Sequence, residues 1–294
     1  MPLSQAQVDE LRVTSTSKFE TQLTQVSEQI YKLFTTQDTF GSEGYVPVML
    51  GGVGAGQEWV TSRVMRAIKE YGVKFTGKLY ENSVKLKNTQ IADAIAATGA
   101  KVGAELAKDA AQFSQEQIEA LLRGNPAGFD AEPVFGEHSY SDAAGAPVYS
   151  NDIAGQNSAW FLLNEHSFVE ATRTGEDYSM QIYGGTADSH LGFTEDAVAM
   201  GWRARKIFAP GFWANSVRSK AALTSENLRA AMTQQAKFKN DAGKRIGARA
   251  QYLVVGHSNA AAAERLIKAA LVDGGNTNVD LGRLQLIVLD GLED

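Results

Sequence analysis

The chain has 294 residues, of which 44% are hydrophobic and none is cysteine, and its formal net charge is −6. Without cysteine it can form neither a disulfide nor a thiolate-ligated metal centre, and no two of its four histidines are close in sequence. No apolar run approaches the ~20 residues that cross a bilayer, and the polar start does not resemble a signal peptide. We therefore expect a soluble, intracellular protein with no metal site and no membrane partner.

The N-terminal stretch, residues 1–45, is rich in Ser, Thr and Gln, and we interpret it as an arm with little core of its own. One short helical pattern interrupts it, formed by four apolar residues: Leu23, Val26, Ile30 and Leu33. A short apolar run at 46–50 then predicts a strand.

A glycine-rich segment follows that strand, and we interpret its glycines as a flexible hinge: Gly51, Gly52, Gly54 and Gly56. A phosphate-binding loop would end in Gly-Lys-Ser/Thr, whereas Gln57 and Glu58 stand there. The helical periodicity of residues 57–71 predicts an amphipathic helix, with Gly72 as its C-cap. Trp59 lies beside its apolar face, and Arg63 lies one turn further on.

The middle of the chain alternates between strand and helix patterns. Residues 78–87 alternate apolar and polar residues and predict a half-exposed strand, with Glu81 on its polar side. Residues 89–123 predict a long Ala-rich helix, which could restart at Ser114. A loop-like region at 125–159 leads to short strands and turns at 159–213.

The C-terminal part predicts helix, strand, helix and strand. Thr224 is expected to cap a helix that runs to about residue 238, and a turn follows at 240–243. The predicted segments after that turn are a strand at 252–255, a helix at 258–271 and a strand at 284–289.

Three groups of side chains could carry chemistry or binding. His138 beside Glu137, and His166 beside Glu165, could suggest acid–base pairs, but both lie in polar loop-like settings, which favours a surface or turn role. Arg203, Arg205 and Lys206 form a basic cluster. Strand alternation puts both arginines on one face, where they could pair with carboxylates of a neighbouring subunit, and the acidic net charge favours this role over DNA contact. The tryptophans are expected in the core rather than against a cofactor: Trp160, Trp202 and Trp213.

Several segments in order resemble the major head subunit family of Mu-like phages, which has the Hong Kong 97-type capsid fold. The similar motifs include Glu58-Trp59-x-x-x-Arg63, Lys78-x-Tyr80-Glu81, Val134-Phe135-x-x-His138, Gly201-x-Arg203-x-Arg205, Gly211-Phe-Trp213 and Tyr252-Leu-Val-Val255. The similarity runs from about residue 45 to residue 292. The motif residues are packing and turn residues, so the resemblance implies no catalytic site and no cofactor.

The resemblance implies an α+β subunit in four parts: an N-terminal arm (1–45), an extended loop region (46–88), a peripheral domain with a spine helix (89–215) and an axial domain (216–294). It implies self-assembly into hexamers and pentamers of an icosahedral shell around double-stranded phage DNA. A separate scaffold protein, a portal and decoration proteins would be the other partners. Subunit contacts are expected at Trp59, Arg63, Glu81, Arg203 and Arg205.

Two other functions stay open at this point. An encapsulin-like compartment would keep the fold and enclose a protein cargo, so what co-purifies with the shell distinguishes it. A soluble nucleotide-binding α/β enzyme is the other alternative, and the missing phosphate loop argues against it.

Overall fold

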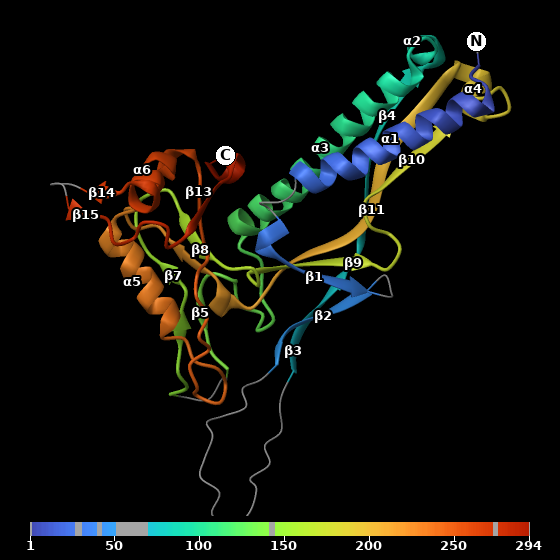
Figure 1. Ribbon diagram of the computed structural model, residues 1–294. Coiled ribbons are helices and arrows are strands. Elements are labelled where there is room, and N and C mark those ends of the chain that lie inside the picture. Colours follow the sequence, from blue (N-terminus) through green and yellow to red (C-terminus); the bar gives the residue numbers. More distant parts are fainter. Residues whose placement is uncertain are drawn as a thin grey trace, which may run out of the picture.

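The computed structural model describes residues 2–26, 31–39, 43–50, 70–140, 145–272 and 276–293. Figure 1 shows an elongated part, built on two long helices and a long β-ribbon, beside a compact part that contains both C-terminal helices. We call them the peripheral part and the axial part. Helices and strands are mixed along the chain, which confirms the expected α+β class.

The peripheral part rests on helix α1 (Gln5–Val26) and the 30-residue helix α3 (Ile95–Gly124), which run side by side in the same direction (Figure 1). Their contact is close at two glycines of α3. A Cβ added at Gly99 would lie 2.7 Å from Oγ1 of Thr14, and one at Gly103 would overlap the carbonyl oxygen of Ser15. The two helices can therefore approach this closely only because α3 has no side chain at these positions.

One face of the peripheral sheet packs against these helices. The sheet has the order β1-β9-β11-β10, and β4 also pairs with β11. Its strands are β1 (Phe34–Thr39), β4 (Lys78–Lys87), β9 (Phe168–Arg173), β10 (Ser179–Gly184) and β11 (Ala197–Pro210). The core between sheet and helices contains Leu11 and Phe19 of α1, Leu106 of α3, and Met200 and Trp202 of β11. The opposite faces of β4 and β10 are largely exposed, because polar residues alternate with the apolar ones.

The axial part is a five-stranded sheet of order β16-β13-β8-β12-β7 with two helices. Its elements are β7 (Asp152–Ile153), β8 (Trp160–Leu163), β12 (Val217–Ser219), α5 (Ser225–Ala236), β13 (Tyr252–Val255), α6 (His257–Lys268) and β16 (Gln285–Val288). All residues of the two central strands, β8 and β13, are buried. Because β8 precedes residue 216 and pairs with β13, the sheet crosses the boundary predicted between the peripheral and axial domains.

Short elements complete the described structure: η1 (Tyr31–Leu33), β2 (Glu43–Leu50), β3 (Glu70–Thr76), α2 (Asn88–Ile91), β5 (Glu137–His138), β6 (Tyr149–Ser150), α4 (His190–Glu195), η2 (Trp213–Asn215), β14 (Leu271–Val272), β15 (Asn276–Thr277) and η4 (Asp290–Glu293). A hydrophobic cluster links the two parts, because Ile118 and Leu122 at the end of α3 pack with Phe161 and Val254 of the axial sheet. The spine helix is thereby anchored on the axial core.

Several predicted elements are confirmed, among them the helix expected at 258–271, which is α6, and the strand expected at 284–289, which is β16. The strand at 46–50 lies within β2, and those at 78–87 and 252–255 coincide with β4 and β13. The helix from Thr224 is α5, and Oγ1 of Thr224 accepts a hydrogen bond of 3.2 Å from the amide of Asn227, as an N-cap does.

Three predictions about helices were wrong. Residues 5–22, interpreted as part of an arm with little core of its own, form most of helix α1, whereas the predicted pattern from Leu23 overlaps only its last residues and residues 27–30 lie outside the described ones. The helix expected to end at residue 71 with Gly72 as its cap cannot do so, because Glu70–Thr76 is strand β3. Helix α3 does not restart at Ser114, whose buried hydroxyl lies 2.8 Å from the Tyr178 hydroxyl.

Candidate assembly interface

The residues predicted to contact other subunits fall into two groups. Trp59, Arg63 and the four hinge glycines at 51, 52, 54 and 56 lie outside the described residues. Glu81, Arg203 and Arg205 lie on β4 and β11 of the peripheral sheet. The predicted roles of both groups stay predictions.

Strand pairing brings Arg203 and Glu81 opposite each other. They are Cα partners in the β4–β11 ladder, and both are exposed. Glu81 accepts a hydrogen bond of 2.9 Å from the hydroxyl of Ser83. Arg205 has a carboxylate partner in its own chain, because its Nε lies 3.1 Å from Oε2 of Glu176. Of the two arginines, Arg203 is therefore the one more accessible to a second molecule.

Lys206 was grouped with these arginines, but its side chain points into the protein. It is 3% exposed and forms ion pairs with buried Glu170 and, at 2.8 Å, with Asp177. Its Nζ also lies 4.2 Å from the centre of the Tyr178 ring. Burial raises the pKa of Glu170 although Lys206 opposes it, whereas for Lys206 the two carboxylates outweigh burial and raise the pKa. Strand alternation separates Lys206 from the two arginines on β11.

The histidines differ from each other in their surroundings. His138 was expected at a surface or turn, and this was wrong: it is fully buried, with Nδ1 2.7 Å from Oδ2 of Asp130. Its ring stacks on Trp213 at 4.5 Å between centroids and an angle of 1°. The His138 ring therefore packs in the axial core. His166 and Glu165 lie on the surface, 3.6 Å apart, as expected.

The sequence analysis missed a group of cations on the axial part, around the buried carboxylate of Asp280. Asp280 is 1% exposed and accepts hydrogen bonds from Arg229 at 2.8 Å, Arg283 at 3.0 Å and Ser225 at 2.7 Å. Burial alone would raise the pKa of Asp280, but these donors outweigh it and lower the pKa to about 2. Arg229 and Arg283 are about half exposed and border a cavity of about 660 Å³.

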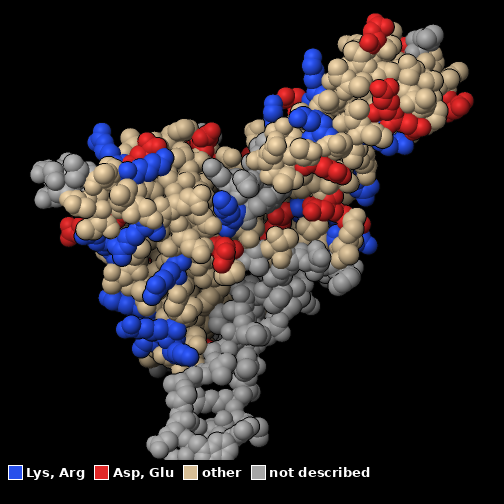
Figure 2. All heavy atoms as spheres, in the orientation of Figure 1, with Lys and Arg blue, Asp and Glu red and all other residues tan. Residues whose placement is uncertain are grey.

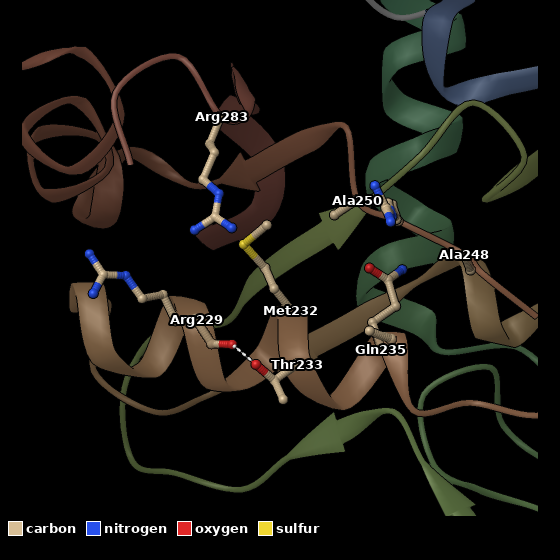
Figure 3. A pocket seen from close by; sticks show the side chains of 9 residues that line it. Arg229, Met232, Thr233, Gln235, Ala248, Ala250 and Arg283 are labelled. Atoms are coloured by element: carbon tan, nitrogen blue, oxygen red, sulfur yellow. Dashed lines mark hydrogen bonds between the residues drawn. The ribbon is translucent and has the colours of Figure 1, made fainter. Parts of the chain in front are cut away.

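That group belongs to a larger basic area. In Figure 2, Lys and Arg gather over the axial part, around α5 and below it. Figure 3 shows Arg229 and Met232 of α5 on one side of the cavity and Arg283 on the other. A count of charged residues within a window would have revealed the cations of residues 237–249, but not the pairing of Arg229 with Asp280, which lie 51 residues apart.

The described residues contain no group of three or more His, Cys, Asp and Glu side chains placed to hold a metal ion. Within the same parts of the chain, no helix has both the length and the apolar content needed to cross a bilayer.

The fold is that of phage capsid subunits. A subunit from the procapsid of bacteriophage JBD30 superposes with a TM-score of 0.79 at 22% identity, covering 99% of this chain and 100% of that one. A subunit of the JBD30 capsid superposes with a TM-score of 0.71 at 18% identity, covering 89% of each chain. These similarities establish the Hong Kong 97-type capsid fold.

The chain belongs to the family described as Mu-like prophage major head subunit gpT, whose model matches residues 8–292. The major capsid protein of Escherichia phage Mu is 26% identical over 276 residues, covering 88% of this chain and 87% of that protein. The Mu-like prophage FluMu major head subunit of Haemophilus influenzae is 25% identical over 294 residues, covering 94% and 91%. The protein is thus a major capsid protein of a tailed phage and a component of the virion capsid. This family membership favours a phage head over an encapsulin-like compartment.

Proposed function

We propose that copies of this chain assemble into hexamers and pentamers of an icosahedral shell, which encloses double-stranded DNA and has no catalytic role. The observation that carries the proposal is the family match over nearly the whole chain. Assembly would take place in the host cytoplasm with a separate scaffold protein, and a portal and decoration proteins would join the shell. A closed lattice sums many contacts, so each subunit contact can be modest.

If the chain forms such a shell, the purified protein should self-assemble in solution. Light scattering over a range of salt and protein concentrations should detect rings or shells. A monodisperse monomer under every condition would contradict the proposal.

Within the proposed subunit, the expected bounds are 1–45 for the arm, 46–88 for the extended loop region, 89–215 for the peripheral domain and 216–294 for the axial domain, but helix α1 packs in the peripheral core and β7 and β8 belong to the axial sheet. Strand β4 pairs with β11 along its whole length, so residues 78–87 are part of the subunit's own sheet. We therefore assign the contact with a neighbouring subunit to the earlier residues of the loop region. The four glycines would let this region swing between hexamers and pentamers.

Trp59 would be the main anchor of that contact, and Arg63 would pair with a carboxylate of the neighbour. A tryptophan is a large and rather rigid side chain of the kind that dominates interface energies. Trp59→Ala should leave the subunit folded and weaken each contact by about 2 kcal/mol. Circular dichroism melts and assembly yields would be measured together, with Trp59→Phe as the matched control. A lower melting temperature with normal assembly would instead place Trp59 in the core of its own subunit.

The exposed pair on the peripheral sheet offers a second test of the interface. Arg203→Glu would introduce repulsion against a partner carboxylate and should reduce assembly, with a smaller loss of subunit stability because Glu81 lies opposite it in the same sheet. Lys101→Glu, at another exposed position on α3, is the control. Equal assembly yields from the two variants would remove Arg203 from the proposed interface.

A further inference from the structure

A short hairpin on the axial part concentrates positive charge. Residues 237–249 contain one acidic residue, Asp241, and five cations: Lys237, Lys239, Lys244, Arg245 and Arg249. Lys239 and Arg245 face each other across a β-bridge, and the chain turns at Asn240–Gly243, where Gly243 has φ of 76°. The segment is therefore positively charged, whereas the whole chain carries a net charge of −6.

All five cations of this segment are exposed. None of them forms an ion pair within the parts of the chain that the structure describes, unlike Arg229 and Arg283 nearby. Like charges this close in sequence repel one another, and an external anion would relieve the repulsion. The hairpin is held firmly at its base, because Phe238 is buried against Trp213 with ring centroids 5.2 Å apart.

The cavity of about 660 Å³ beside the hairpin combines charge with apolar surface. Its rim carries Arg229, Arg249 and Arg283, and its lining includes Met232, Ala236 and Ala248. Figure 3 shows that Met232 and the side chains of Arg229 and Arg283 extend into the same space. Asp280 holds both of these guanidinium groups, so they are oriented before any ligand arrives. One carboxylate shared by two guanidinium groups leaves a positive site.

The combination of charge and apolar lining distinguishes between two kinds of anionic partner. A DNA backbone would satisfy the exposed cations, but its phosphates offer nothing apolar for the Met232 side of the cavity. A protein segment with carboxylates and one apolar side chain would satisfy both features. The observations therefore favour a peptide over a nucleic acid.

We propose that the hairpin and the adjacent cavity form a docking surface for an acidic, amphipathic segment of a separate protein. The apolar side chain of that segment enters the cavity beside Met232, and its carboxylates contact Arg249, Lys244 and Arg245. This inference goes beyond the proposed shell-forming function and does not depend on it, because it concerns binding to the single subunit.

The test uses the full-length chain in its unassembled form and three fluorescent probes. The first is a 16-residue helical peptide with Glu on one face and Leu on the other, the second replaces each Leu by Ser, and the third is a short DNA duplex. We expect the Leu peptide to bind about tenfold more tightly than the Ser peptide, because burial of one Leu side chain contributes about 1.5 kcal/mol or more. We also expect it to bind more tightly than the duplex.

Charge-reversal variants locate the binding site. The triple variant Lys244→Glu, Arg245→Glu and Arg249→Glu should weaken binding of the Leu peptide by at least about tenfold, which corresponds to about 1.4 kcal/mol. The matched control reverses three exposed cations elsewhere, Lys18, Lys101 and Arg265, which likewise form no ion pair within the described residues, and should leave binding unchanged. Met232→Gln should remove the preference for the Leu peptide over the Ser peptide. Circular dichroism would check that every variant is folded.

Several results would overturn the proposal. Tighter binding of the duplex would make the surface a nucleic-acid site, and equal binding of the Leu and Ser peptides would reduce it to a patch of charge. Unchanged peptide binding by the triple variant, together with lost assembly in light scattering, would assign the surface to a second copy of this chain. Because assembly and peptide binding are measured separately, failure of the docking proposal and failure of the shell proposal can be distinguished.

Discussion

The axial and peripheral parts bury their strands in different ways. In the axial sheet, every residue of β8 and β13 is buried, because helices and loops cover both faces. In the peripheral sheet, β4 has no fully buried residue and β10 alternates between exposed and partly buried residues. The axial part therefore completes a core within one chain, whereas the peripheral sheet leaves a face that other molecules can cover.

The C-terminal segment and the rest of the chain also differ in net charge. Residues 216–294 contain 11 Lys and Arg against eight Asp and Glu, whereas residues 1–215 contain 17 against 26. The two segments therefore carry net charges of +3 and −9. A chain with such opposed ends can contact further molecules by charge complementarity as well as by shape. Substitutions in either part should therefore change the free energy of unfolding through the packing and charge pairing of that part.

The largest effect is expected in the axial core at Trp213. This side chain packs against His138, Phe238 and Tyr149, and it is 2% exposed. Trp213→Ala should lower the free energy of unfolding by about 4 kcal/mol, because the cavity left behind can only partly collapse. Chemical denaturation of the unassembled subunit measures this, with Trp213→Phe as the smaller change. A loss below about 1 kcal/mol would show that the surrounding side chains can fill the space left by Trp213.

The next effect concerns the buried ion pair of the peripheral part. Lys206→Met should destabilise the subunit by about 3 kcal/mol, because it leaves Glu170 charged and unpaired in the interior. The double variant Lys206→Met and Glu170→Leu removes both charges and should recover most of that loss. A double variant no more stable than the single one would mean that the pair itself, rather than the avoided lone charge, holds β9 and β11 together.

A smaller and local effect is expected where α1 crosses α3. Gly103→Ala places a methyl group on the carbonyl oxygen of Ser15, so α1 should shift, at a cost of about 2 kcal/mol. Hydrogen exchange should increase in α1 and remain unchanged in the axial sheet. Gly124→Ala is the matched control, because a Cβ there meets nothing within 4 Å. Equal exchange in the two variants would contradict the close helix crossing.

The smallest effect is a pH dependence in the axial part. Hydrogen bonds from Arg229, Ser225 and Arg283 outweigh burial and lower the pKa of Asp280 to about 2, below the ~3.9 of an unfolded aspartate. Its contribution is therefore complete above about pH 4 and is lost as the pH falls toward 2. We expect a loss of about 1 kcal/mol, reduced by the solvent around the half-exposed arginines. Urea unfolding of Asp280→Asn should show a weaker acid dependence over this interval; an unchanged one would assign the dependence to other carboxylates.

Local periodicity was sufficient to predict several elements. The alternation of residues 78–87 and the apolar run at 252–255 identified β4 and β13, and the polar residue Thr224 identified the start of α5. The order of short motifs was sufficient to indicate the family and with it the fold. Such elements can be predicted because the periodicity of a strand or helix appears directly in the order of apolar and polar residues along the sequence.

Helix α1 shows what local patterns could not predict. Its hydroxyl side chains made residues 1–26 resemble an arm, yet Ser15 and Thr24 donate hydrogen bonds to backbone carbonyls of the preceding turn. The helix gains its stability from burial of Leu11 and Phe19 against residues about 90 positions later in the chain. No pattern within the N-terminal stretch contains that information.

The same reason applies to the charged side chains. Tertiary packing decided that Lys206 points inward to Glu170, that His138 stacks in the core on Trp213, and that Asp280 pairs with Arg229 of α5. Lys206 and Glu170 are 36 residues apart, His138 and Trp213 are 75 apart, and Arg229 and Asp280 are 51 apart. The sequence supplied the charges and the rings, but only the pairing of distant strands and helices determined which of them meet and which stay exposed.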